Sequence, residues 1–259
     1  IMTHRSIALA LLGLVVGAGH LFGQDKKEKT RSFTADFGFV SAAGNTSVTT
    51  FNIGDKFVVN SADKKVVFTQ VFSAVRSEAD GVKNAENFRG QLRLDYGVGH
   101  RFYLFGLTGW ERNRPAGIAR RFEETLGLSF KAVSQPQDEL NFEFGLSLFQ
   151  QKNTEAINGQ LLNDDYMAGR LAGAYKHIFN ASTILTQQLE LIPNFDDSDD
   201  FRLNSESALV APISTHIAVK LGYVIRYDNL PSLLPAPNPT LDRFKKTDRF
   251  LTAGLTISY

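Results

Sequence analysis

Charged residues recur at alternate positions of the sequence, between apolar neighbours, and could line a water-filled interior. The candidates are Arg89, Arg93, Asp95, Arg121, Glu123, Glu143, Arg170, Lys220 and Arg226. Successive side chains of an extended strand point to opposite faces, so these charges share the face opposite the apolar residues. Charges removed from bulk water must pair or stay hydrated. The pattern therefore indicates either a narrow channel lined by both signs, with weak ion selectivity, or a salt-bridged plug.

Residues suited to catalysis are scarce. A lipid-modifying enzyme of this architecture would need a serine beside a histidine on the lipid-facing surface. His216 shares its face with Ala218 and Lys220 and is expected to point inward, whereas His177 could face outward without a serine beside it. We therefore expect no enzymatic activity and no cofactor.

An acidic run, DDSDD at 196–200, could bind a hard cation through its carboxylate oxygens. It lacks the glycine and the spaced ligands of a calcium loop. A solvated acidic loop is the favoured interpretation, and no metal site is expected.

The N-terminal residues have the pattern of a secretory signal peptide. His4 and Arg5 precede an apolar run over 7–18, which is shorter than the roughly 20 residues of a membrane-spanning helix. The expected organisation is a signal peptide at 1–23, a charged spacer at 24–30 and one β-domain at 31–259. Without Arg5, the 28 Lys and Arg residues fall to 27, which equals the 27 Asp and Glu residues. Such balance gives no electrostatic reason to expect nucleic acid as a partner.

A two-residue hydrophobic rhythm extends through almost all of the remaining chain. It predicts strands near 31–40, 51–59, 64–77, 88–98, 101–112, 121–131, 140–148, 165–178, 182–193, 200–212, 217–228 and 247–259, about twelve in all. Most runs reach the roughly 9–11 residues that a tilted strand needs to cross a membrane, against about 5–6 for an average soluble strand. The expected fold is all-β, an antiparallel up-and-down transmembrane barrel.

The connections support a barrel with two different ends. Long outer loops are predicted at 77–86, 112–119, 150–164, 193–200 and 229–246, after a short one at 42–46. Short periplasmic turns are predicted at 61–65, 99–101, 134–138, 179–182 and 211–215.

The C-terminal stretch LTAGLTISY alternates apolar and small or polar residues up to a terminal aromatic. We expect it to close the sheet against the strand at 31–40, which would remove an exposed edge. Leu255, Ile257 and Tyr259 also have the pattern of a signal for barrel-assembly machinery. Interfacial aromatic girdles are expected from Tyr96, Tyr103, Trp110, Tyr166, Tyr175, Tyr223 and Tyr227.

Three stretches carry a resemblance to a known family: SAAGNTSVTTFNIGDKFV (41–58), RLDYGVGHRFYLFGLTGWERNRPAGIARRF (93–122) and KTDRFLTAGLTISY (246–259). They are similar to the salt-induced outer membrane protein family of Gram-negative bacteria, which is classed as a domain of unknown function. The resemblance covers about 30–259 and implies an outer-membrane barrel with a link to osmotic stress. It carries over no catalytic residues.

The expected function is a non-enzymatic outer-membrane barrel, either a narrow passive channel or an envelope-structure protein. Its expected partners are outer-membrane lipid, lipopolysaccharide and the barrel-assembly machinery, with the chain itself a monomer. Two alternatives stay open at this point: a lipid-modifying barrel enzyme and a soluble periplasmic β-protein.

Overall fold

A computed structural model of the protein describes residues 30–42, 48–79, 82–154, 163–180, 183–234 and 242–258. The expected signal peptide at 1–23, residues 24–29 of the expected spacer, and Tyr259 lie outside the described residues. Among the described residues, no helix has the length and apolar character that crossing a membrane requires.

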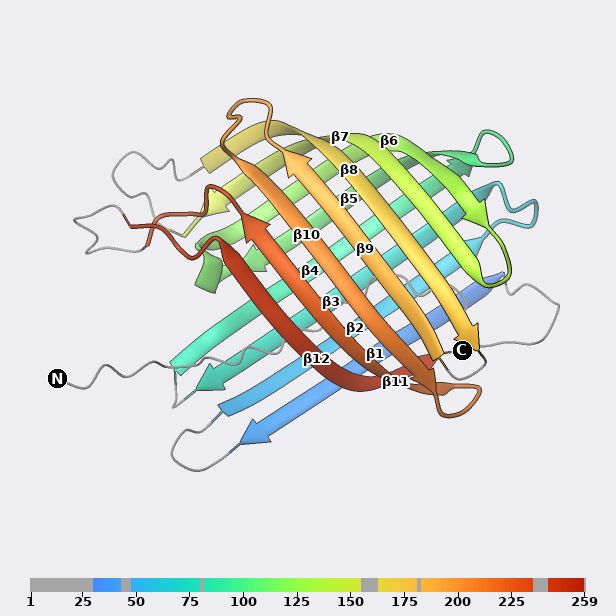
Figure 1. Ribbon diagram of the computed structural model, residues 1–259. Coiled ribbons are helices and arrows are strands. Elements are labelled where there is room, and N and C mark those ends of the chain that lie inside the picture. The colour runs from blue at the N-terminus through green and yellow to red at the C-terminus, as the bar shows by residue number, and fades with distance from the viewer. Residues whose placement is uncertain are drawn as a thin grey trace.

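Twelve β-strands make up nearly all of the described chain (Figure 1). They are β1 (Arg31–Ala42), β2 (Val48–Asn60), β3 (Val66–Ala79), β4 (Val82–Gly97), β5 (Phe102–Asn113), β6 (Ile118–Ser134), β7 (Asp138–Asn153), β8 (Asn163–Asn180), β9 (Thr183–Pro193), β10 (Phe201–Pro212), β11 (Ile217–Asp228) and β12 (Thr247–Ser258). A short 3-10 helix, η1 (Arg114–Ala116), separates β5 from β6. The shortest strand has 11 residues and the longest 18, so every strand reaches the length that a membrane crossing needs.

The strands form one closed antiparallel barrel in which each pairs with its neighbours in sequence. β12 closes the sheet against β1, with Thr34 opposite Ser258 and Phe37 opposite Leu255. The expected up-and-down barrel and its closure by the C-terminal strand are therefore confirmed. Each described strand therefore has a hydrogen-bonded neighbour on both sides, which satisfies backbone polar groups within the sheet.

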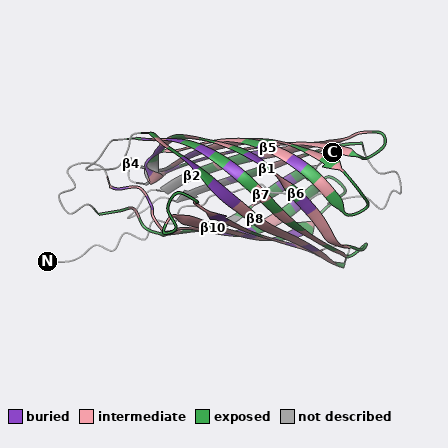
Figure 2. Ribbon diagram, turned by 90° about the horizontal axis from the view of Figure 1, so that it is seen from above, coloured by how far each residue is buried: buried purple, intermediate pink, exposed green. Residues whose placement is uncertain are grey.

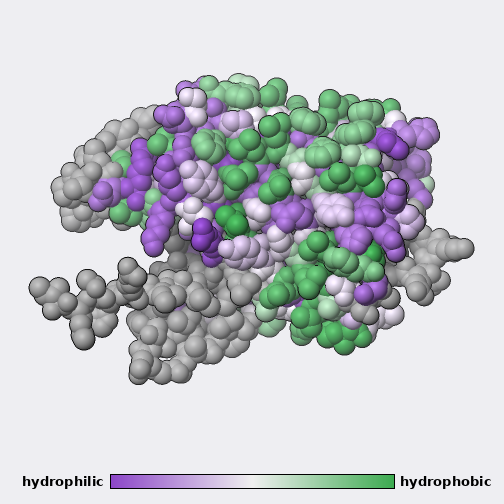
Figure 3. All heavy atoms as spheres, in the orientation of Figure 1, coloured by the Kyte–Doolittle hydropathy of each residue, from purple (hydrophilic) through white to green (hydrophobic). Residues whose placement is uncertain are grey.

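The apolar face of the sheet points outward. Leu126 is 75% exposed, whereas the adjacent Thr125 is 2% exposed. The same alternation of exposed and buried residues runs along the strands in Figure 2. In Figure 3 the apolar residues gather over the strands, and hydrophilic residues are frequent towards the two ends. This arrangement, apolar outside and polar inside, is that of a transmembrane barrel rather than of a soluble β-protein.

Two ends of the barrel can be distinguished by their connections. The turn end carries the short connections after β2, β4, β6, β8 and β10, and the loop end carries those after β1, β3, β5, β7, β9 and β11.

In the turn after β2, Ser61 Oγ and the backbone N–H of Lys65 donate to Asp63 Oδ1 over 2.5 and 3.1 Å. These two bonds hold the pKa of Asp63 below its usual value, because they favour the ionised carboxylate.

Two of the long loops predicted at the loop end are wrong. Strand pairing continues through most of 77–86, with Ser77 opposite Ala85 and Ala79 opposite Val82, so only residues 80 and 81 separate β3 from β4. Residues 112–119 are mostly β5, η1 and β6. Both predictions failed because polar residues were taken as loop, although a polar face continues along a strand as readily as along a loop.

The prediction of aromatic girdles is wrong for two of its members. Tyr103 accepts a hydrogen bond from Lys131 Nζ over 3.0 Å, on the inner face. Tyr166 is buried and stacks on Phe149, with 5.1 Å between ring centroids. Both rings therefore fill the interior.

Candidate functional site in the barrel lumen

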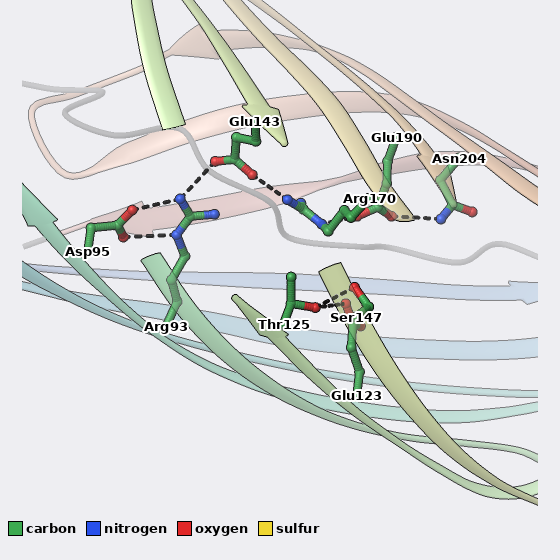
Figure 4. Close-up of polar contacts among 9 residues, drawn as sticks. All are labelled: Arg93, Asp95, Glu123, Thr125, Glu143, Ser147, Arg170, Glu190 and Asn204. Carbon is green, nitrogen blue, oxygen red and sulfur yellow. Dashed lines mark hydrogen bonds and ion pairs between the residues drawn. The ribbon is translucent and has the colours of Figure 1, made fainter. Parts of the chain in front are cut away.

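A continuous chain of ion pairs crosses the inner face of the barrel (Figure 4). Arg93 on β4 donates from Nε and Nη2 to Asp95, over 2.8 and 2.6 Å. Its Nη2 also lies 2.8 Å from Glu143 Oε1 on β7, so this contact bridges over β5 and β6. We refer to Asp95, Arg93, Glu143, Arg170, Glu190 and Asn204 as the lumen chain.

The second half of the lumen chain continues from Glu143 across β8, β9 and β10. Arg170 Nη1 lies 2.5 Å from Glu143 Oε2, and Arg170 Nε lies 2.8 Å from Glu190 Oε1. Asn204 Nδ2 donates to Glu190 Oε2 over 2.8 Å. Each carboxylate thus has a donor on both oxygens, which is the condition under which charges with little access to water are stable.

An aromatic ring supports the two arginines of the lumen chain. The guanidinium of Arg93 lies 4.2 Å from the centroid of the Phe105 ring and that of Arg170 lies 5.7 Å from it. Phe105 is 3% exposed and lies over Gly127 and Gly145. A Cβ on Gly127 would come within 2.6 Å of Phe105 Cζ, so the glycine provides the space that the ring occupies. The ring in turn limits where the guanidinium groups can lie.

Other inner charges pair where β1, β12, β11 and β10 adjoin. Lys220 Nζ lies 3.4 Å from Asp36 Oδ2 and 3.9 Å from Glu206 Oε1. Thr256 Oγ1 donates to Asp36 Oδ1 over 2.6 Å. These contacts connect β1 with β10 and β11 as well as with its neighbour β12.

Arg121 and Glu123 occupy the inner face of β6. Arg121 Nε donates to Gln151 Oε1 over 2.7 Å, and its Nη1 lies 3.6 Å from Glu111 Oε2. Glu123 accepts a hydrogen bond of 3.0 Å from Thr125 Oγ1.

A polar cavity of about 300 Å³ lies beside the lumen chain. Its charged lining comprises Lys56, Arg89, Arg93, Glu123, Glu143, Arg170, Glu190, Glu206 and Arg226. Six of the nine candidates from the sequence line this cavity: Arg89, Arg93, Glu123, Glu143, Arg170 and Arg226. Asp95 pairs with Arg93 of the lining, and Arg121 and Lys220 make ion pairs elsewhere on the inner face. The arrangement can hold water and small polar solutes within an apolar shell.

A segment of the β11–β12 connection reaches across the loop end. In the strand order, the β5–β6 pair lies half a circuit from the β11–β12 pair. Yet Gly117, between η1 and β6, lies so close to this connection that a Cβ there would be 2.9 Å from Ser232 Cβ. Phe244 N–H donates to Ser232 O over 3.0 Å, and Arg243 Nη1 donates to Pro231 O over 2.7 Å. These two hydrogen bonds join the two described parts of the connection. The mouth is therefore partly covered.

The catalytic and metal candidates have structural contacts. His177 Nδ1 lies 2.7 Å from Asp138 Oδ1, which also accepts a 2.7 Å hydrogen bond from the Tyr175 hydroxyl. In the acidic run, Asp200 Oδ2 accepts from Asn194 Nδ2 over 2.8 Å, and Asp197 Oδ1 accepts from the backbone of Asp199. Within the described ranges, no group of three or more His, Cys, Asp or Glu residues is arranged to hold a metal ion.

Sequence reasoning missed two members of the site. Asn204 carries no charge and was not singled out, although it completes the coordination of Glu190. Phe105 was not expected inside, because its strand shows only weak alternation. The inward position of Phe105 could have been inferred from Gly127 and Gly145, which lie opposite each other at inward positions of neighbouring strands and have no side chains to fill that space.

A known family matches most of the chain. The family described as "Protein of unknown function, DUF481" matches residues 35–259. A protein of Escherichia coli K12, "Uncharacterized protein YdiY", is 25% identical over 186 residues, which cover 72% of this chain and 67% of the relative. Neither description assigns an activity.

Solved outer-membrane structures show a looser likeness. The translocator domain of the autotransporter NalP from Neisseria meningitidis matches with a TM-score of 0.48 and 14% identity, covering 91% of this chain and 90% of that one. The NanC porin matches with a TM-score of 0.49 and 8% identity, covering 88% and 97% respectively. Both TM-scores fall below 0.5, so neither likeness bears on function.

Proposed function

The chain belongs to the DUF481 family of proteins of unknown function, and on that premise we propose that it is a non-enzymatic barrel of the bacterial outer membrane that acts as a narrow passive pore. The outward-facing leucine and phenylalanine side chains support the membrane location. Phe144, Leu146 and Leu148 on β7 are 56, 57 and 50% exposed. Exposure of such apolar side chains to water is unfavourable, whereas lipid acyl chains would cover them.

The lumen chain is the observation that supports a narrow pore. Barrels of eight strands are filled by side chains, whereas those of sixteen or more leave a wide aqueous channel, so twelve strands lie between the two. Here the contact of Arg93 with Glu143 and that of Arg170 with Glu190 occupy part of the interior. The polar cavity beside them leaves room for water and small solutes.

Planar-bilayer recording on the refolded chain tests this function. We expect small, regular conductance steps for the wild type. Glu143→Ala removes the carboxylate that joins the two arginines of the lumen chain and should enlarge the steps. Glu124→Ala removes a carboxylate from the exposed outer face of the neighbouring strand and should leave the steps unchanged. Absence of steps in all three proteins would refute the pore and favour a purely structural role in the envelope.

We further propose that a response to salt would arise in the same lumen. Added salt shortens the Debye length from about 10 Å at 0.1 M to about 3 Å at 1 M, which weakens interactions between hydrated charges. We therefore expect the conductance to rise more steeply with salt than the conductivity of the bulk solution. If the conductance rises only in proportion to the conductivity of the bulk solution, the pore does not respond to salt.

Assembly is proposed to depend on the C-terminal strand. Leu255 and Ile257 are 48 and 39% exposed on the outer face, where both barrel-assembly machinery and lipid could contact them. The proposed surroundings are outer-membrane lipid and lipopolysaccharide, with the chain as a monomer. Separation on a denaturing gel before and after heating, combined with membrane fractionation, tests this location; recovery of the chain in the soluble fraction would contradict it.

A further inference from the structure

Three of the cations that line the cavity in the lumen form no ion pair with another described residue. Its lining includes Lys56 from β2, Arg89 from β4 and Arg226 from β11. Among the described residues, no carboxylate lies within ion-pair distance of any of the three, and none of them makes a side-chain hydrogen bond. Arg226 Nε is in addition fully shielded from solvent. We refer to these three residues as the cation trio.

The nearby carboxylates are engaged elsewhere. Glu143 and Glu190 are bound by the arginines and the asparagine of the lumen chain. Glu206 Oε1 lies 3.9 Å from Lys220 Nζ, while its buried Oε2 has no hydrogen-bond partner among the described residues, and Glu123 accepts a hydrogen bond from Thr125. Five cations and four carboxylates line the cavity, and none of these carboxylates lies within ion-pair distance of the trio.

This arrangement is costly for the empty protein. Arg89 and Arg226 line the same cavity, and like charges that share a site with little water repel each other. A guanidinium presents several N–H donors in a planar fork, which matches the oxygen atoms of a carboxylate or phosphate. An anion between the two arginines would relieve the repulsion and supply the missing acceptors.

We propose that the cation trio is a binding site for a small oxyanion, a solute bearing carboxylate or phosphate groups. The inference deepens the proposed function, because it names the class of solute that the lumen favours. The cavity volume lies at the lower end of the roughly 300–1,000 Å³ that is usual for small-molecule pockets, so the ligand is small. It also revises the expectation of weak selectivity: among the described residues, three of the five cations that line the cavity have no ion-pair partner, against one of its four carboxylates, Glu123.

Calorimetric titration of the refolded barrel in an uncharged detergent tests the site directly. The probes are inorganic phosphate and citrate, which separate the two oxyanion chemistries, with glucose as a neutral solute of comparable size. We expect one or both anions to bind and glucose not to bind. Arg89→Gln and Arg226→Gln should each weaken binding by about tenfold, since each removes charge-assisted hydrogen bonds.

The matched control is Arg76→Gln, which removes the same charge from an exposed position of β3. It should bind the anions as the wild type does, and heat-modifiable migration shows whether each variant has folded. Equal affinity in the Arg89 and Arg226 variants, or no binding of either anion to the wild type, overturns the site. Calorimetry measures binding independently of conductance. If the wild type binds an anion but gives no conductance steps, the pore is refuted and the site is supported. If it gives conductance steps but binds no anion, the pore is supported and the site is refuted.

Discussion

Replacing Glu143 by glutamine tests whether the lumen chain stabilises the barrel. Glu143 receives Arg93 on one oxygen and Arg170 on the other, at 2.8 and 2.5 Å. A hydrogen bond to a charged group contributes about 1.5–3 kcal/mol, and two such bonds lose their charge in the variant. Arg93 keeps Asp95 and Arg170 keeps Glu190, so neither arginine is left alone. The expected loss in the free energy of unfolding is therefore about 2 kcal/mol, a change of about thirtyfold in the equilibrium constant.

The assay is equilibrium unfolding in urea from lipid vesicles. Trp110 is the single tryptophan of the chain and reports insertion through its fluorescence. Glu139→Gln is the matched control, because Glu139 lies on the same strand and pairs with Lys176 at 3.1 Å but is about half exposed. Lys176 is buried, but the Glu139 carboxylate keeps contact with water, so its replacement should cost less than that of Glu143, about 0–1 kcal/mol. An unchanged stability of Glu143→Gln, or an equal loss in Glu139→Gln, would show that the Glu143 contacts do not stabilise the barrel.

Three further changes have defined outcomes. Gly127→Ala places a Cβ within 2.6 Å of Phe105 Cζ and closer still to the backbone oxygen of Phe144, so it should destabilise the barrel by about 1–3 kcal/mol in the same unfolding assay, as overpacking does; wild-type stability would contradict this close packing. Gly117→Ala places a side chain at a residue with φ of 79°, a left-handed conformation that favours glycine, and directs it towards Ser232. The β11–β12 connection should then pack less closely against Gly117 and be cleaved faster by trypsin. An unchanged cleavage rate would contradict this packing. Deletion of Tyr259 should reduce the fraction of chain assembled in the membrane without altering the conductance of the chains that do assemble, and full assembly would count against its role as a signal.

Much of the fold could be predicted because alternation is a local property. The runs around Phe142 and around Leu221 specify strands and their two faces without reference to any other part of the chain. The loop predicted over 77–86 failed for a local reason as well. Asp80-Gly81 is a strong signal for a two-residue hairpin, and the polar residues on both sides belong to paired strands.

The site was less accessible to sequence reasoning, because its contacts depend on how the barrel closes. The alternation specifies that Arg93 and Glu143 point inward, but their contact bridges two intervening strands and depends on strand tilt and stagger. Asp95 could have been proposed as a partner of Arg93, since residues two apart share a face. Among the described residues Arg89 and Arg226 have no ion-pair partner, and this could not be predicted, because it follows from which carboxylates the other cations engage.

Swelling of liposomes that contain the refolded chain tests the narrow pore most directly. Solutes of graded size measure the opening, and the lumen chain is the feature that is proposed to restrict it. The account predicts that glycerol enters, that a disaccharide is excluded by the wild type, and that Glu143→Ala admits larger solutes than the wild type does. Exclusion of glycerol by both proteins, or the same size limit in both, would contradict it.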